Sequence, residues 1–155
     1  MKRGEDIEKN VKTMIGRTTR RLMTTSSRVY GIGTDITKVS RFEELLRKRE
    51  RRFIERALHS KEIEEYENIE SEEKRILFVA SRWAVKESVY KAMQMDQLQF
   101  PEIRIEKREN GKPDVVFEGE AEKFANRMNI RDTFVSISHD GDYAVAFVTL
   151  TSEQQ

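Results

Sequence analysis

The first clear pattern along the chain is a stretch of apolar and β-favouring residues interrupted by glycine. Residues 28–36 have this character and contain Gly31 and Gly33. Glycine inside a strand marks a place where another part of the chain comes close to the backbone. The pattern therefore predicts a closely packed strand, with Asp35 at or just past its end.

Apolar residues then recur at helical spacing in two short stretches, 39–46 and 53–58. Every residue of the run between them, 47–52, is charged. We expect two amphipathic helices here. His59 or Ser60 is suited to cap a further helix, and a long helix is predicted over about residues 72–93.

After Pro101 the period of the apolar positions changes from helical to two. Residues 103–105 and 115–117 flank Asn110-Gly111, a pair typical of a tight hairpin turn. A short helix is predicted over 120–128, and a second hairpin over 133–139 and 143–148. This order of helices and strands, without an internal repeat, predicts an α+β fold.

The composition fits one compact domain and excludes several kinds of site. The 155 residues are 37% hydrophobic, and they include no apolar run near the roughly 18 residues that a membrane span requires. We therefore expect a soluble globular domain without membrane contact. Since the chain has no Cys and only 2 His, disulfides, thiolate zinc sites, Cys nucleophiles and His-rich metal sites are excluded.

Charge is distributed unevenly along the chain. Residues 1–28 hold eight basic and three acidic residues, a net charge of +5, whereas the whole chain has a net charge of +1. The Arg-, Ser- and Thr-rich stretch 16–28 is typical of an organellar transit peptide, and a disordered tail is the alternative. A nucleic-acid-binding arm is a third possibility. The predicted division is a basic extension over 1–28 and a domain over 29–151, located in the cytoplasm or a mitochondrion.

Glu87 is the first candidate for chemistry. On a helix over 76–93 it falls within a largely apolar stripe, and a second apolar side suggests that the helix is buried on more than one face. A carboxylate that is partly removed from water needs a proton, a cation or a metal. The alternative is an ordinary i,i+4 ion pair with Lys91, worth about 0.2–0.5 kcal/mol on an exposed helix.

Asp35 adds a second carboxylate at the end of the glycine-containing strand. Two such carboxylates can hold magnesium while phosphate oxygens and water complete the shell. Taken alone, such an Asp is more often a turn or helix-cap residue. His139, at the end of a predicted strand, is a phosphate partner, a general base or a polar surface residue, and for His59 only capping is predicted.

The basic residues between 41 and 52 also have two interpretations. They alternate with glutamates, as on a solvated helix face. They would equally suit a docking face for an acidic protein, where complementary charge raises the rate of association.

Four sequence motifs, each weak alone, point to one protein family when they are taken together. They are Gly31-Ile32-Gly33-Thr34-Asp35-Ile36 with Arg41-Phe42, Arg82-Trp83-Ala84-Val85-Lys86-Glu87-Ser88 with Lys91-Ala92, Gly111-Lys112-Pro113, and Ser136-Ile137-Ser138-His139. In this order and spacing they resemble the holo-acyl-carrier-protein synthases, the small 4'-phosphopantetheinyl transferase family. The resemblance extends over residues 31–150. It implies that family's fold, a small antiparallel sheet packed against a long central helix, and a homotrimer with active sites between subunits.

The resemblance implies transfer of phosphopantetheine from coenzyme A to a serine of apo-acyl carrier protein, with release of adenosine 3',5'-bisphosphate. Asp35 and Glu87 match the carboxylates that hold magnesium against the pyrophosphate, and Lys91 would neutralise further phosphate charge. Glu87, directly or through water, is the preferred base for the serine proton. The resemblance also suggests roles for three further groups of residues: Lys86 and His139 near the nucleotide phosphates; Gly111, Lys112 and Pro113 in the coenzyme A cleft; and Arg41, Arg51 and Arg52 in docking of the acidic carrier-protein helix.

The chain departs from the family pattern at two places. Residues 93–96 stand where a Gly-rich turn often follows the long-helix motif, and His59 stands where Thr is common. A competing hypothesis from another class is a non-catalytic, basic interaction module that binds an acidic protein or nucleic acid. The transferase hypothesis predicts no nucleic-acid partner.

Overall fold

The computed structural model of the protein describes residues 27–153. A three-stranded antiparallel sheet has the order β1-β5-β4, formed by β1 (Ser27–Lys38), β4 (Ile130–Asp140) and β5 (Tyr143–Glu153). A second, two-stranded sheet pairs β2 (Ile103–Lys107) with β3 (Pro113–Phe117). The predicted α+β class and both hairpins are confirmed.

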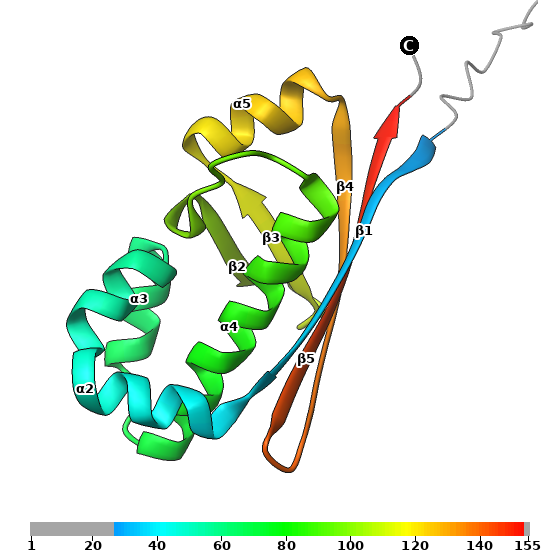
Figure 1. Ribbon diagram of the computed structural model, residues 1–155. Coiled ribbons are helices and arrows are strands. Elements are labelled where there is room, and N and C mark those ends of the chain that lie inside the picture. Colours follow the sequence, from blue (N-terminus) through cyan, green and yellow to red (C-terminus); the bar gives the residue numbers. More distant parts are fainter. Residues whose placement is uncertain (1–26, 154–155) are drawn as a thin grey trace, which may run out of the picture.

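The helices lie on one side of the larger sheet (Figure 1). They are α2 (Val39–Ala57), α3 (Ser60–Glu67), α4 (Glu72–Met93) and α5 (Gly119–Arg127), with a short 3-10 turn η1 (Phe100–Glu102). The long helix α4 crosses the sheet face and separates two apolar clusters, one shared with the sheets and α5, the other with α2 and α3. It therefore belongs to both cores. This confirms the prediction, made from apolar residues on more than one side of the helix, that it is buried on more than one face.

The predicted boundaries of α4 are confirmed, and Ser71 caps its start by accepting a hydrogen bond from the Lys74 N–H. His59 caps α3, because its ring accepts from the Lys61 N–H while the Glu62 carboxylate accepts from the His59 N–H. The two helices predicted around residues 47–52 form one element, α2, with non-helical backbone at Arg49 (φ −150°, ψ 33°). The charged run thus contains a break in the helix, not a loop.

Gly31 and Gly33 explain why β1 and α4 lie so close together. A Cβ atom on Gly33 would lie 1.9 Å from the Ser88 carbonyl oxygen, and one on Gly31 would lie 1.9 Å from that of Ala92. No other residue has a side chain small enough for these positions, since real Cβ contacts essentially never fall below 3.0 Å. The glycines let the helix backbone rest directly on the strand, as predicted.

The other face of the larger sheet carries large apolar side chains that are exposed. Alternation along the strands puts Ile32 and Ile36 of β1, Phe134 of β4 and Phe147 of β5 on this face, with exposed fractions of 46–65%. No element between residues 27 and 153 covers it (Figure 1). An apolar face of this kind marks a surface for association.

The predictions for the basic extension, a transit peptide or a disordered tail, concern residues that lie almost entirely outside the described part of the chain. None of the helices between residues 27 and 153 combines the length and apolar character needed to cross a membrane.

Candidate active site

Asp35, Glu87 and Lys91 meet where β1 lies against α4. β1 continues to Lys38, so Asp35 lies within the strand and the prediction that it lies at or past the strand end was wrong. It follows Gly31 and Gly33 at alternate positions of β1, so its side chain faces the helix. The Lys91 ammonium donates to Asp35 Oδ1 and to the Thr34 carbonyl oxygen, each at 2.8 Å. Glu87 lies one turn earlier on α4. Lys91 is thus paired with Asp35, and the i,i+4 ion pair with Glu87 is not formed.

Glu87 is half-buried, as the stripe on α4 predicted. Burial raises the pKa of its carboxyl above the usual range, and the nearby Asp35 charge raises it further, while Lys91 and Arg41 act in the opposite direction. Two carboxylates that repel each other in a partly dry place are stabilised by a cation between them.

This donor set fits magnesium, because hard carboxylate oxygens are its usual protein ligands and it keeps several waters or phosphate oxygens. Within residues 27–153 no group of three or more His, Asp or Glu side chains is arranged to hold a metal ion. The two carboxylates could therefore supply only part of a coordination shell, and a phosphate-bearing ligand would have room to supply more.

A basic groove of about 790 Å³ begins beside Trp83, one turn before Glu87 on α4. Its apolar lining includes Phe53 of α2, Trp83 of α4 and Phe100 of η1; the Phe53 and Trp83 ring centroids are 5.5 Å apart, and those of Trp83 and Phe100 are 5.1 Å apart. Arg41 lies over the Trp83 ring at 6.0 Å and also acts on the Glu87 pKa. Arg41 thus lies between the groove and the carboxylates.

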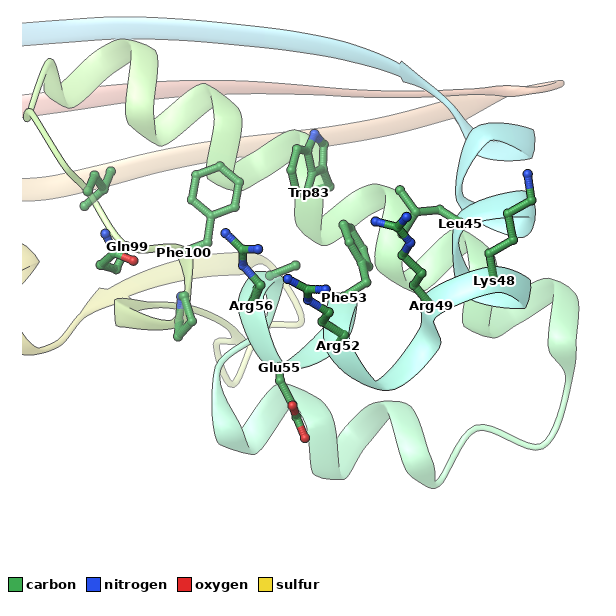
Figure 2. A pocket seen from close by; sticks show the side chains of 13 residues that line it. Leu45, Lys48, Arg49, Arg52, Phe53, Glu55, Arg56, Trp83, Gln99 and Phe100 are labelled. Carbon is green, nitrogen blue, oxygen red and sulfur yellow. The ribbon is translucent and has the colours of Figure 1, made fainter.

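Both halves of α2 contribute cations to this groove, namely Lys48, Arg49, Arg52 and Arg56. Figure 2 shows the side chains of Arg49, Arg52 and Arg56 extending into the same space as the aromatic rings. Of the three predicted docking residues, Arg52 lines the groove and Arg41 borders it. Arg51 does neither, since its side chain is 91% exposed, pairs with Glu55 and lines a different cavity.

The basic residues between 41 and 52, which the sequence suggested as a docking face, include Lys48 and Arg49, whereas Arg56 lies outside that range. The signal for Arg56 is its i,i+4 spacing from Arg52 in the second half of α2, with Phe53 between them.

Lys86 is where the structure disagrees most with the predicted site. Its side chain is fully buried, and the ammonium donates to Glu62 Oε2 at 2.6 Å and to the carbonyl oxygens of Ala57 and Phe100 at 2.8 and 3.0 Å. All three donors are used inside the protein, so this ammonium has no free donor for a nucleotide phosphate. Burial lowers the pKa of Lys86 to about 8, against the effect of the Glu62 charge.

The remaining predicted residues lie elsewhere on the chain. Gly111, Lys112 and Pro113 line a second cavity of about 480 Å³, together with Arg82 and Ser136. His139 is exposed at the end of β4, opposite Ala144 of β5. None of Asp35, Glu87, Lys91 and His139 lines the second cavity. Within one chain, the predicted coenzyme A residues Gly111, Lys112 and Pro113 therefore line a different site from the predicted metal ligands Asp35 and Glu87.

The family model described as 4'-phosphopantetheinyl transferase superfamily matches residues 31–148. The holo-[acyl-carrier-protein] synthase of Orientia tsutsugamushi (strain Boryong) is 36% identical over 129 residues, which cover 80% of this chain and 98% of that protein.

Solved structures agree. The holo-ACP synthase of Plasmodium yoelii has a TM-score of 0.76 and 32% identity, covering 83% of this chain and 99% of that chain. The synthase of Helicobacter pylori in complex with coenzyme A has a TM-score of 0.64 and 30% identity, covering 77% and 98%.

The chain belongs to the 4'-phosphopantetheinyl transferase superfamily and, within it, to the holo-[acyl-carrier-protein] synthases. The predicted family and enzyme class are confirmed, and the matched region includes Asp35, Glu87 and Lys91.

Proposed function

We propose that this protein transfers the 4'-phosphopantetheine group from coenzyme A to a serine of apo-acyl carrier protein and releases adenosine 3',5'-bisphosphate. The observation that carries the proposal is the meeting of Asp35, Glu87 and Lys91 next to a basic groove. The names of the relatives and the coenzyme A complex of the Helicobacter pylori synthase support the same substrates.

Asp35 and Glu87 would hold Mg²⁺, which would supply neutralising charge to the pyrophosphate of coenzyme A. Lys91, with its ammonium 2.8 Å from Asp35, adds positive charge at the same place. The raised pKa of Glu87 suits a base that accepts the proton of the serine hydroxyl, directly or through a water. As that oxygen bonds to the phosphorus nearest the pantetheine, the bond from this phosphorus to the bridging oxygen breaks. Adenosine 3',5'-bisphosphate leaves with the electron pair.

The groove would receive the carrier protein. Its four cations suit an acidic helix, and its aromatic floor suits the apolar side chains of that helix. Because Trp83 lies one turn from Glu87, a serine at the end of the docked helix could reach the carboxylates. We therefore assign docking to Arg52 with Lys48, Arg49 and Arg56, and assign Arg41 to the junction between groove and carboxylates.

The exposed sheet face supports the predicted homotrimer. Association through Ile32, Ile36, Phe134 and Phe147 would cover apolar surface that a monomer leaves in water. It would also allow the cavity at Gly111, Lys112 and Pro113, with His139, to come from a neighbouring subunit and complete the coenzyme A site. This fits the separation of these residues from Asp35 and Glu87 on one chain.

The test compares Asp35→Asn and Glu87→Gln with Glu64→Gln, an exposed carboxylate on α3. Transfer of phosphopantetheine to an apo-acyl carrier protein is measured across a magnesium titration. Both site variants should lose at least about 100-fold in kcat/KM, since each removes a carboxylate that would hold the magnesium neutralising the reacting phosphate, whereas Glu64→Gln should match the wild type. Site variants with near wild-type activity would refute the assignment of these carboxylates.

A further inference from the structure

The buried ion pair between Lys86 and Glu62 is a feature that the proposed reaction does not use. Both side chains are fully buried, and their charged atoms are 2.6 Å apart. A buried pair of this kind adds little net stability compared with apolar residues, because both charges lose their hydration. Its presence therefore needs another explanation. One is that the pair fixes a particular conformation, and the bonds that Glu62 and Lys86 make to their neighbours show which one.

Both carboxylate oxygens of Glu62 accept hydrogen bonds. Oε2 accepts from the His59 N–H at 2.9 Å as well as from Lys86, and Oε1 accepts from the Ile105 N–H at 3.0 Å. Arg82 Nε lies 3.3 Å from Oε1 but makes no hydrogen bond. Glu62 thus fixes the start of α3 to β2 and offers Lys86 a rigid anion.

Lys86 uses its other two donors on backbone oxygens at the edges of the groove. Ala57 ends α2 and Phe100 begins η1, and both residues line the groove. The carbonyl of Ala57 belongs to the last turn of its helix, where such groups lack helical partners and favour a cation. A single ammonium therefore connects two groove walls, which come from distant parts of the sequence, to α4.

The position of Lys86 along α4 gives these contacts their significance. It directly precedes Glu87, and the helix turns about 100° between neighbours, so the two side chains point in different directions from the same turn. Glu87 lies in the carboxylate site with Asp35, and Lys86 bonds to the backbone of the groove walls. The Lys86 bonds thus connect the Ala57 and Phe100 carbonyl oxygens to the turn of α4 that bears Glu87.

We propose that Lys86 and Glu62 form a positioning unit that holds the Ala57 and Phe100 walls of the groove in register with Glu87, and thereby determine how the carrier protein engages. This inference rests on the proposed function. Lys86 is a positioning residue here, because its ammonium is bonded to Glu62 and two backbone oxygens and not to Asp35 or Glu87.

The main test is Lys86→Met, which removes the ammonium and keeps an unbranched apolar chain. Glu62 keeps its bonds to His59 and Ile105 and still has Arg82 beside it, and Lys86 does not line the second cavity. We expect the KM for the carrier protein to rise at least about tenfold, and the Kd for coenzyme A to stay within about twofold. A merely structural role would lower the active fraction, and so lower kcat, without changing the KM for the carrier.

The matched control is Lys123→Met/Glu120→Gln, which removes an exposed ion pair on α5 that does not line the groove, and which should leave all constants unchanged. If Lys86→Met does not fold, Lys86→Met/Glu62→Gln removes both buried charges and carries the same expectation. A fall in kcat alone, or equal weakening of carrier protein and coenzyme A, would overturn the proposal. Wild-type protein without transfer would instead refute the proposed function, before any variant is compared.

Discussion

Replacing Gly33 with alanine tests whether the contact between β1 and α4 sets the active site. The added Cβ would lie 1.9 Å from the Ser88 carbonyl oxygen, at least 1.1 Å closer than the 3.0 Å below which Cβ contacts essentially do not occur. Both atoms in conflict are held by regular structure, so neither can rotate away. The helix must move off the strand by about 1 Å, and Glu87 and Lys91 move with it.

Two consequences follow from this displacement. Overpacking of this kind costs roughly 1–3 kcal/mol of unfolding free energy, which a domain of ordinary stability survives. A misplacement of about 1 Å in a catalytic group costs on the order of 100-fold in rate. Gly33→Ala should therefore remain folded, with a lowered denaturation midpoint, and lose about 100-fold in transfer activity.

Gly141→Ala is the control, because Gly141 has a positive φ of 52° but no atom within 4 Å of the added Cβ. It brings backbone strain of roughly 1–2 kcal/mol without moving α4. Urea unfolding and steady-state transfer are measured on both variants under conditions where each is folded. Transfer by Gly33→Ala within threefold of wild type, or an equal loss in Gly141→Ala, would refute the reasoning.

Three further predictions concern charge and association. The raised pKa of Glu87 means that its ionised form costs folding free energy, because that form is less stable in the folded than in the unfolded protein. Glu87→Gln should therefore raise the melting temperature of the metal-free protein at pH 7. Calorimetry should show this gain shrinking toward pH 4, where the wild-type carboxyl is protonated. Arg52→Glu should raise the KM for the carrier protein about tenfold at low salt and less at high salt, whereas Arg51→Glu, outside the groove, should change it little; equal effects would contradict the groove assignment. Ile36→Asp adds a charge to the exposed sheet face without touching the core, so light scattering should show a smaller assembly if that face is the interface, and an unchanged mass would exclude it.

Sequence periodicity predicted α4 well for identifiable reasons. The helix has apolar residues on more than one side and a Ser71 cap, so its length and burial are both visible in the sequence. The sequence supported the proximity of Asp35 and Glu87 less firmly, because the number of residues between them does not determine the distance between their carboxylates. The two glycines that bring strand and helix together supply the missing physical reason.

Lys86 shows what the sequence could not reveal. The family resemblance placed it near the nucleotide phosphates, but it precedes Glu87 on the helix and neighbours on a helix point in different directions. Its partner Glu62 lies on another helix, and no spacing rule links the two. The groove was only partly predictable for a similar reason, since the break at Arg49 changes which basic residues face inward.

The transfer reaction itself can be observed through the intact mass of an apo-acyl carrier protein. The carrier is incubated with this protein, coenzyme A and magnesium, beside a sample in which magnesium is chelated. A mass gain equal to one phosphopantetheine group, only in the presence of magnesium, is the predicted result. No gain, from a folded protein that binds coenzyme A and with carrier proteins of several kinds, would contradict the account.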